Sequence, residues 1–105
     1  MSVHVLKTWP VYFAAVKRGE KLFEVRRNDR FFQLGDQVDL VEYDPAPSRL
    51  AYVMPDGRHS NNAAQANRLS FLVGPVLQGG QFGLDAGYCA FSLLPLPAKE
   101  ATDDE

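Results

Sequence analysis

Short segments of alternating hydrophobic and polar residues recur along most of the chain. A period of two is typical of β-strands with one buried face. One stretch departs from this pattern, because the apolar residues after Pro10 follow a helical spacing as far as Gly19. The pattern therefore predicts one helix within a chain of strands. The predicted strands cover residues 4–7, 21–27, 37–43, 50–54, 69–77 and 88–94.

The predicted helix has a signal at each end. Pro10 suits the first turn of a helix, where a missing N–H costs no hydrogen bond. Gly19 suits the left-handed residue that often ends a helix. The spacing between them predicts that Tyr12 and Val16 face the core, with Phe13 beside them.

Proline and glycine residues are predicted to end or break the later strands. The segment Asp44 to Pro47 should end the third strand, because two prolines cannot continue a ladder. Gly74 and Pro75 should break or bulge the strand over residues 69–77. Residues 59–67 are polar and leave two readings open, a short helix capped by Ser60-Asn61-Asn62 or a mobile excursion.

The order of elements favours an α+β fold that is mainly β. Strands far outnumber crossover helices, which disfavours a doubly wound sheet and favours a small mixed β-barrel with one or two packed helices. A chain of 105 residues is long enough for one domain with its own core. We expect this domain to span residues 1–97, with residues 48–67 as an inserted loop and residues 98–105 as a disordered acidic tail.

Composition narrows the class of protein. The net charge is −2, yet residues 1–30 carry seven Lys and Arg against three acids, and the remainder carries four against ten. A near-neutral total argues against non-specific duplex binding but leaves room for a local basic patch. No apolar run approaches the ~20 residues of a membrane span. A single cysteine fits a reducing compartment, so we expect a cytoplasmic protein with no membrane partner.

The most informative segment is the charged strand that follows the helix. Alternation predicts Phe23 and Val25 on a buried face, and it places Glu24 and Arg26 together on the opposite face. Lys21 lies at the turn just before this strand. A cation, an anion and a second cation thus converge within roughly 7 Å of strand. The segment is either a surface ion pair or the wall of a polar pocket that binds phosphate or a carbonyl oxygen, with Lys21 and Glu24 as candidate catalytic residues.

Other residues could extend such a pocket. Trp9 and Phe82 are candidate stacking surfaces for a base, although an aromatic residue is more often part of a core. Arg27 and Arg30 could extend a basic rim, and Arg30 could equally belong to a simple turn.

Metal and cofactor signals are weak. His4, His59 and Cys89 lack the spacing of metal ligands, so we predict no metal site, and Cys89 reads as a buried thiol. The segment Gly79-Gly80-Gln81-Phe82-Gly83 could let the backbone approach a ligand closely, or could be a tight connection. It lacks the lysine and the strand-then-helix context of a phosphate loop, and we expect no cofactor.

The segment from Gly19 to Arg26 resembles the Gly-x-Lys-x-x-Glu-x-Arg signature of the ASCH domain, in the PUA-like superfamily. Further blocks resemble an ASCH-related branch catalogued as a domain of unknown function. Those blocks are His4-x-Leu6-Lys7, residues 23–32, Leu34-Gly35-Asp36, residues 79–84 and Gly87-Tyr88. The resemblance implies a PUA-type β-barrel with a cleft beside the signature strand, lined by Lys21, Glu24 and Arg26.

The same resemblance implies three kinds of function. PUA-like domains commonly bind RNA or modified nucleotides, so the first expectation is binding of RNA, single-stranded nucleic acid or a nucleotide. Some ASCH relatives are hydrolases, acting on acetylated cytidine as amidohydrolases or on RNA as ribonucleases. The amidohydrolase pattern has a threonine where this chain has Glu24, and it needs a downstream glutamate that is absent between Glu42 and Glu100. The third reading is a protein-interaction domain, and the oligomeric state stays open.

Overall fold

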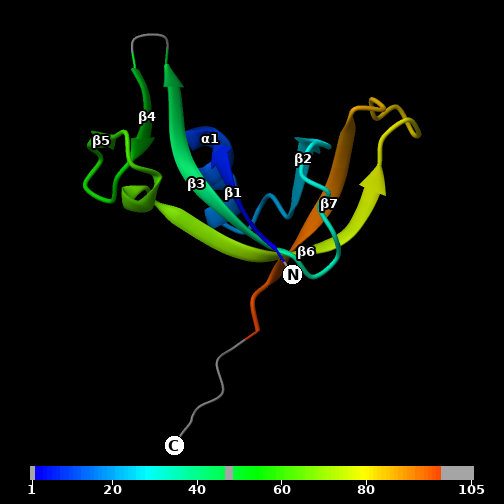
Figure 1. The fold of residues 1–105 in the computed structure, drawn as a ribbon. Coiled ribbons are helices and arrows are strands. Elements are labelled where there is room, and N and C mark those ends of the chain that lie inside the picture. Colours follow the sequence, from blue (N-terminus) through cyan, green and yellow to red (C-terminus); the bar gives the residue numbers. More distant parts are fainter. Residues whose placement is uncertain (1, 47–48, 98–105) are drawn as a thin grey trace, which may run out of the picture.

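A computed structural model describes residues 2–46 and 49–97, and it is mainly β, as predicted. The predicted acidic tail at residues 98–105 lies outside the described residues. The chain begins with a strand and a helix, and the other elements are strands and one 3₁₀ turn (Figure 1). The elements are β1 (Val3–Thr8), α1 (Pro10–Lys17), β2 (Phe23–Arg27), β3 (Gln37–Ala46), β4 (Arg49–Val53), β5 (His59–Ser60), η1 (Ala63–Gln65), β6 (Arg68–Gln78) and β7 (Tyr88–Pro95).

The strands form one strongly bent sheet in the order β2-β7-β6-β3-β4-β5, and β1 runs parallel to β3. Figure 1 shows β3 and β4 rising on one side and β2 and β7 on the other, with α1 on the β3 side. Across the described residues β1 pairs with β3 and β2 pairs with β7, and no backbone pairing joins β1 to β2. The opening between β1 and β2 is where the pocket described below lies.

The helix α1 begins and ends where its signals predict, but it turns a different face to the core. Pro10 is its first residue, and Gly19 has a φ of +79° just after its last turn. Phe13 and Val16 are buried, whereas Tyr12 is 48 % exposed. The prediction that Tyr12 packs in the core is therefore wrong, because that face of the helix borders the opening between β1 and β2.

Strand β3 supplies the centre of the core. Val38 and Leu40 are fully buried, and they pack in one cluster with Val73 of β6 and Phe91 of β7. Because β1 and β6 both pair with its first half, β3 is covered on both edges.

The strand β3 ends within the predicted segment, but at Ala46 and not at residue 43, so the expectation that Pro45 cannot lie in the strand is wrong; Pro47 lies outside the described residues. Glu42 donates its N–H to Asn67 at the β6 edge. Alternation then places the nitrogen of Pro45 on the opposite edge, where the β1 pairing has already stopped at Thr8. Pro45 therefore costs this strand no ladder hydrogen bond.

Strand β6 carries the predicted bulge. Its pairing with β7 shifts between Val73 and Val76, which brackets Gly74 and Pro75. A Cβ atom at position 74 would lie 2.0 Å from Ser92 Oγ, so any side chain there would require Ser92 to move.

The segment between β3 and β6 holds regular structure in its described residues. Strands β4 and β6 pair antiparallel with successive parts of β3, and residues 54–67 connect these two strands. Of the two alternatives for residues 59–67, the short helix is confirmed, because Asn62 accepts a hydrogen bond from the N–H of Ala64 and caps η1.

Two buried aspartates stabilise the described part of the fold at neutral pH. Asp39 accepts hydrogen bonds from Gln37, Ser70 and Arg68 at 2.7–3.0 Å. Burial raises the pKa of Asp39, but these hydrogen bonds and the Arg68 charge outweigh it and leave the pKa below its usual range. Asp36 likewise has a lowered pKa, chiefly because of its hydrogen bond with His4.

A depressed carboxyl pKa predicts loss of stability in acid. The unfolded state binds its proton first, so the contribution of Asp39 is fully present above pH ~4 and is lost as the pH falls through the folded-state pKa. Urea unfolding between pH 2 and 7 should show this decline, and Asp39→Asn should flatten it. Asp85→Asn, which changes an exposed carboxylate, should leave the decline intact. Identical pH profiles for Asp39→Asn and the wild type would contradict the assignment.

Candidate functional site

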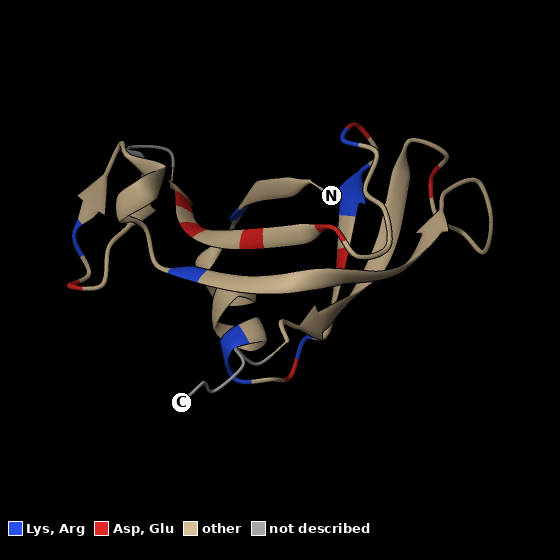
Figure 2. Cartoon of the chain, turned by 60° about the horizontal axis from the view of Figure 1, so that its bottom comes forward, with Lys and Arg blue, Asp and Glu red and all other residues tan. Residues whose placement is uncertain are grey.

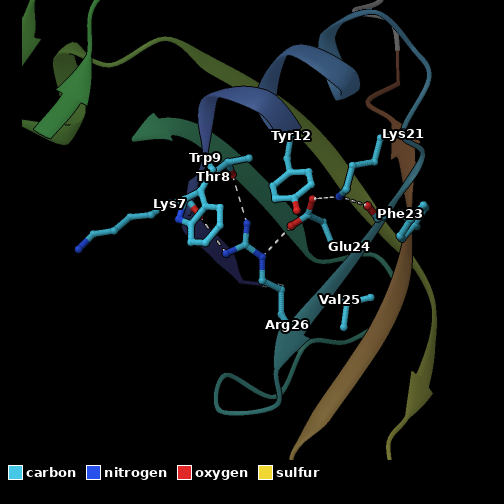
Figure 3. Close-up of a pocket in the computed structure, with 9 residues that line it drawn as sticks. All are labelled: Lys7, Thr8, Trp9, Tyr12, Lys21, Phe23, Glu24, Val25 and Arg26. Carbon is cyan, nitrogen blue, oxygen red and sulfur yellow. Dashed lines mark hydrogen bonds and ion pairs between the residues drawn. The ribbon is translucent and has the colours of Figure 1, made fainter. Parts of the chain in front are cut away.

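A pocket of about 320 Å³ opens between the end of β1 and the start of α1 on one side and β2 on the other (Figure 3). This volume is at the small end of the range of ligand sites in proteins, which suits a ligand the size of one nucleoside. Its lining residues are Lys7, Thr8, Trp9, Tyr12, Lys21, Phe23, Glu24, Val25 and Arg26.

Glu24 lies at the base of this pocket between two cations. Its side chain is almost completely buried, and it accepts from Lys21 Nζ and from Arg26 Nε, each at 2.6 Å. Its two carboxylate oxygens each bind one cation, which is the pattern of strong charge-assisted hydrogen bonds. The three residues therefore form one cluster, which confirms the predicted convergence of their charges.

The face that β2 buries is opposite to the predicted one. Phe23 and Val25 are 52 % and 47 % exposed, whereas Glu24 is 3 % exposed. Alternation along the strand is as predicted, but the inward side of this edge strand meets the pocket and not an apolar core. A buried ion cluster thus takes the place that the hydrophobic pattern assigned to Phe23 and Val25.

Arg26 also joins the two strand edges that lack backbone pairing. One terminal nitrogen donates to the carbonyl of Lys7 at 3.0 Å, and the other donates to Thr8 Oγ1 at 3.2 Å. Arg30 makes a parallel link to the carbonyl of Val5 at 3.0 Å. Side-chain donors therefore hold β1 beside β2, and the bonds of Arg26 position the floor of the pocket.

Lys21 keeps one donor available for a ligand. Its ammonium has three N–H groups, of which one contacts Glu24 and another contacts the carbonyl of Phe23 at 2.5 Å. Its Nζ lies 4.8 Å from the centre of the Phe23 ring and 6.0 Å from that of Tyr12. The cation is thus held between two aromatic rings at the pocket mouth (Figure 3).

Aromatic side chains form the upper wall of the pocket. The rings of Trp9 and Tyr12 stack on each other, with centres 6.1 Å apart and planes 24° apart. Trp9 is 54 % exposed and Tyr12 is 48 % exposed, so about half of each residue is open to solvent. Exposed rings beside a fixed charge cluster are suited to stacking a planar ligand.

The local charge favours an anion. Lys21 and Arg26 carry two positive charges against the single negative charge of Glu24, and the backbone of Lys7 lies close by while its Nζ points toward the ring of Tyr43. Figure 2 shows that the two signs are unevenly distributed, with several acidic positions along β3, whose sequence has no Lys or Arg. The pocket cluster, with two cations and one carboxylate, carries a net positive charge of one, which favours a negative ligand.

The structure brings four of the residues that the sequence proposed to one place, namely Trp9, Lys21, Glu24 and Arg26. Three others do not line this pocket. Arg27 lies over the ring of Tyr88 at 6.0 Å, Arg30 lines a separate polar hollow beside Asp36, and Phe82 is 88 % exposed in the β6–β7 connection.

The sequence did not single out the other lining residues as site residues. They are Lys7, Thr8, Tyr12, Phe23 and Val25. One signal was available, because Lys7 and Thr8 directly precede Trp9 at the end of a predicted strand. No local pattern could show that this strand end lies opposite β2, since the two segments meet only through tertiary contacts.

Metal-binding and membrane features can be assessed for the described residues. Across residues 2–46 and 49–97, no group of His, Cys, Asp and Glu side chains is arranged to hold a metal ion. Cys89 is buried, and burial followed by the charge of Asp29 raises the pKa of its thiol. No helix in the same residues has the length and apolar character needed to cross a bilayer.

The pocket lies within a segment that matches a known family. A family model described as a domain of unknown function, DUF3850, matches residues 3–93. The chain belongs to this family. No curated protein matches the chain. The DUF3850 match covers every residue that lines the pocket, so the cluster around Glu24 is part of the family domain and not an appendage to it.

Proposed function

We propose that this DUF3850 domain binds a nucleotide, either free or as one unit of RNA or another single-stranded nucleic acid, in the pocket beside β2. The observation that carries the proposal is the pairing of the Lys21–Glu24–Arg26 cluster with the stacked rings of Trp9 and Tyr12 in one small cavity. A nucleotide needs both features, since its base has flat π-faces and its phosphate is an anion.

The arrangement supports a division of labour among the cations. Arg26 uses three of its donors on Glu24, Lys7 and Thr8, so its main task is to hold β1 and β2 together. Lys21 retains a donor at the pocket mouth and is the better phosphate ligand. The base would then lie against Trp9 or Tyr12, each of which is about half open to solvent.

We further infer that the family is a branch of the ASCH domains in the PUA-like superfamily. The inference rests on the signature from Gly19 to Arg26, whose charged members Lys21, Glu24 and Arg26 share one pocket. A cytoplasmic location also stays a proposal, resting on the single cysteine.

The geometry favours binding over hydrolysis. Both oxygens of Glu24 are already occupied by cations, so neither is directed at a ligand proton. Lys21 acts as a donor to Glu24 and to the Phe23 carbonyl, and it is not poised as a nucleophile. Turnover of acetylcytidine or RNA by the purified protein, abolished by Lys21→Ala, would favour the hydrolase reading instead.

A thermal-shift and calorimetry screen tests the proposal. The probes are the four ribonucleoside 5′-monophosphates and short single-stranded RNAs at low ionic strength. A probe at a hundred times its Kd should stabilise the protein by about 2.7 kcal/mol, which gives a Tm rise of several degrees. Absence of a shift and of binding heat for every probe would overturn the proposal. Capture of one stoichiometric protein partner after nuclease treatment, with no probe bound, would support the protein-interaction reading.

Lys21→Gln should weaken binding of a monophosphate about tenfold, because one cation–phosphate contact is lost. For the same reason, the slope of the logarithm of the binding constant against the logarithm of the salt concentration should become shallower by about one. The measurement is the Kd at several salt concentrations. Lys17→Gln is the matched control, since Lys17 is exposed in the last turn of α1 and does not line the pocket. Equal Kd values for both variants would remove Lys21 from the phosphate site.

A further inference from the structure

The outer edge of β2 presents main-chain groups toward the opening beside the pocket. Leu93 donates its N–H to Leu22 at 2.9 Å, and Asn28 donates to Gly87 at 2.8 Å. These two bonds show which residues of β2 exchange hydrogen bonds with β7, because hydrogen-bonded and non-hydrogen-bonded pairs alternate in an antiparallel ladder. The N–H and C=O groups of Phe23, Val25 and Arg27 therefore point away from β7.

Most of the carbonyls along this opening already have a donor. The Phe23 carbonyl accepts from Lys21 Nζ at 2.5 Å, and the Arg27 carbonyl accepts from the N–H of Asp29 at 2.9 Å. Across the opening, the carbonyls of Val5 and Lys7 accept from arginine side chains. On the β2 edge, the N–H and C=O of Val25 make no hydrogen bond within the described part of the chain.

Val25 also borders the pocket. It is among the lining residues, yet its side chain points away from the Glu24 carboxylate and the Arg26 guanidinium (Figure 3). What Val25 presents at the edge beside the pocket is thus one main-chain donor and one main-chain acceptor. An edge of this kind recognises a complementary donor–acceptor edge.

We propose that the main chain of Val25 reads the hydrogen-bonding edge of the base, with its C=O accepting from a base N–H and its N–H donating to a neighbouring base acceptor. The inference rests on the proposed function and adds to it the part of the ligand that the pocket recognises. Each common base has an N–H or NH₂ donor next to an acceptor on its Watson–Crick edge, so the contact selects a base with that edge unpaired.

The pattern of occupied carbonyls favours a base over an added peptide strand. A strand joining β2 would need successive acceptors along the edge, but the carbonyls on either side of Val25 are already bonded within the protein. A planar base needs only two adjacent contacts, which is what Val25 offers. The aromatic rings of Trp9 and Tyr12 in the same pocket supply the stacking face that a base requires.

The first test changes the ligand. Each monophosphate that binds is compared with an analogue whose base stays uncharged but whose N–H next to the edge acceptor is replaced by N–CH₃, namely 3-methyluridine, 1-methylguanosine, N6,N6-dimethyladenosine or N4,N4-dimethylcytidine monophosphate. Because an unmatched polar group is costly, the loss should weaken binding about tenfold. The control is the 2′-O-methyl analogue, which adds a methyl group away from the base edge and should bind as the parent does.

The second test removes the donor from the protein. Val25→Pro deletes an N–H that takes no part in the β2–β7 ladder, so the edge strand can accept it. Arg27→Pro deletes the equivalent N–H one pair further along, outside the pocket, and is the matched control. If Val25→Pro does not fold, the backbone amide shift of Val25 in ¹H–¹⁵N spectra of the wild type is followed while the monophosphate is added.

The outcomes separate the two proposals. Weaker binding of edge-blocked analogues, together with a shifted Val25 amide or a loss specific to Val25→Pro, supports the inference. Unchanged binding of the edge-blocked analogues overturns the inference but leaves nucleotide binding standing. Binding of an extended peptide in place of every nucleotide probe overturns both.

Discussion

Glu24→Gln is expected to lower the free energy of unfolding by about 3 kcal/mol, the largest loss we foresee for a single substitution near the pocket. Removing one partner of a buried ion pair costs ~3–5 kcal/mol, because the opposite charge stays buried without compensation. Here two cations lose the same carboxylate. The lower end of that range applies because Lys21 and Arg26 keep 18 % and 23 % of their side chains exposed.

The measurement is urea unfolding of wild type and variant at pH 7. Glu20→Gln is the matched control, since it removes the same charge from an exposed pair with Arg18 and should change the free energy of unfolding little. The difference between the two variants isolates the effect of burial. Similar costs for both variants would mean that water reaches the Glu24 cluster and that the pocket floor is not a buried cluster.

Trp9→Ala and Tyr12→Ala should each weaken nucleotide binding roughly ten- to hundredfold, because stacking of one base on an aromatic ring contributes ~1–3 kcal/mol. Both rings are about half exposed in the free protein, so their removal should change the Tm little. Calorimetric Kd values for one monophosphate and one short RNA are the measurement, with Tm values to check the fold.

Phe82→Ala is the control for these stacking variants. Phe82 is the most exposed large aromatic residue of the described chain, and it lies outside the pocket. Its loss should leave monophosphate binding unchanged. If Phe82→Ala weakens binding as strongly as Trp9→Ala does, the base lies at the β6–β7 connection and the site has been placed wrongly.

Some structural features could be predicted because they depend on local chemistry. The ends of α1 follow from Pro10 and Gly19, and the bulge of β6 follows from Gly74-Pro75. Strand alternation places Glu24 and Arg26 on one side, and Lys21 joins them from the turn just before the strand. Each of these features needs only a few consecutive residues to determine it.

Other predictions failed because they required knowledge of neighbouring elements. The continuation of β3 through Pro45 depends on which edge the proline nitrogen faces. The exposure of Tyr12 depends on what covers that side of α1. Neither fact is present in the local sequence, since both depend on strands that are distant along the chain.

The sequence by itself determined a mainly β chain with one helix and a charged strand on which Glu24 and Arg26 share one side, with Lys21 at the turn before it. The tertiary structure alone decided that this side faces inward and that Trp9, Thr8 and the backbone of Lys7 lie opposite it. The reason is physical. Alternation sorts side chains into two faces, but burial of either face depends on which strands pair and which edges stay open. Within the described residues β1 and β2 are not paired with each other and are joined by Arg26, so a polar cluster occupies the interior position and the apolar side chains of β2 face outward.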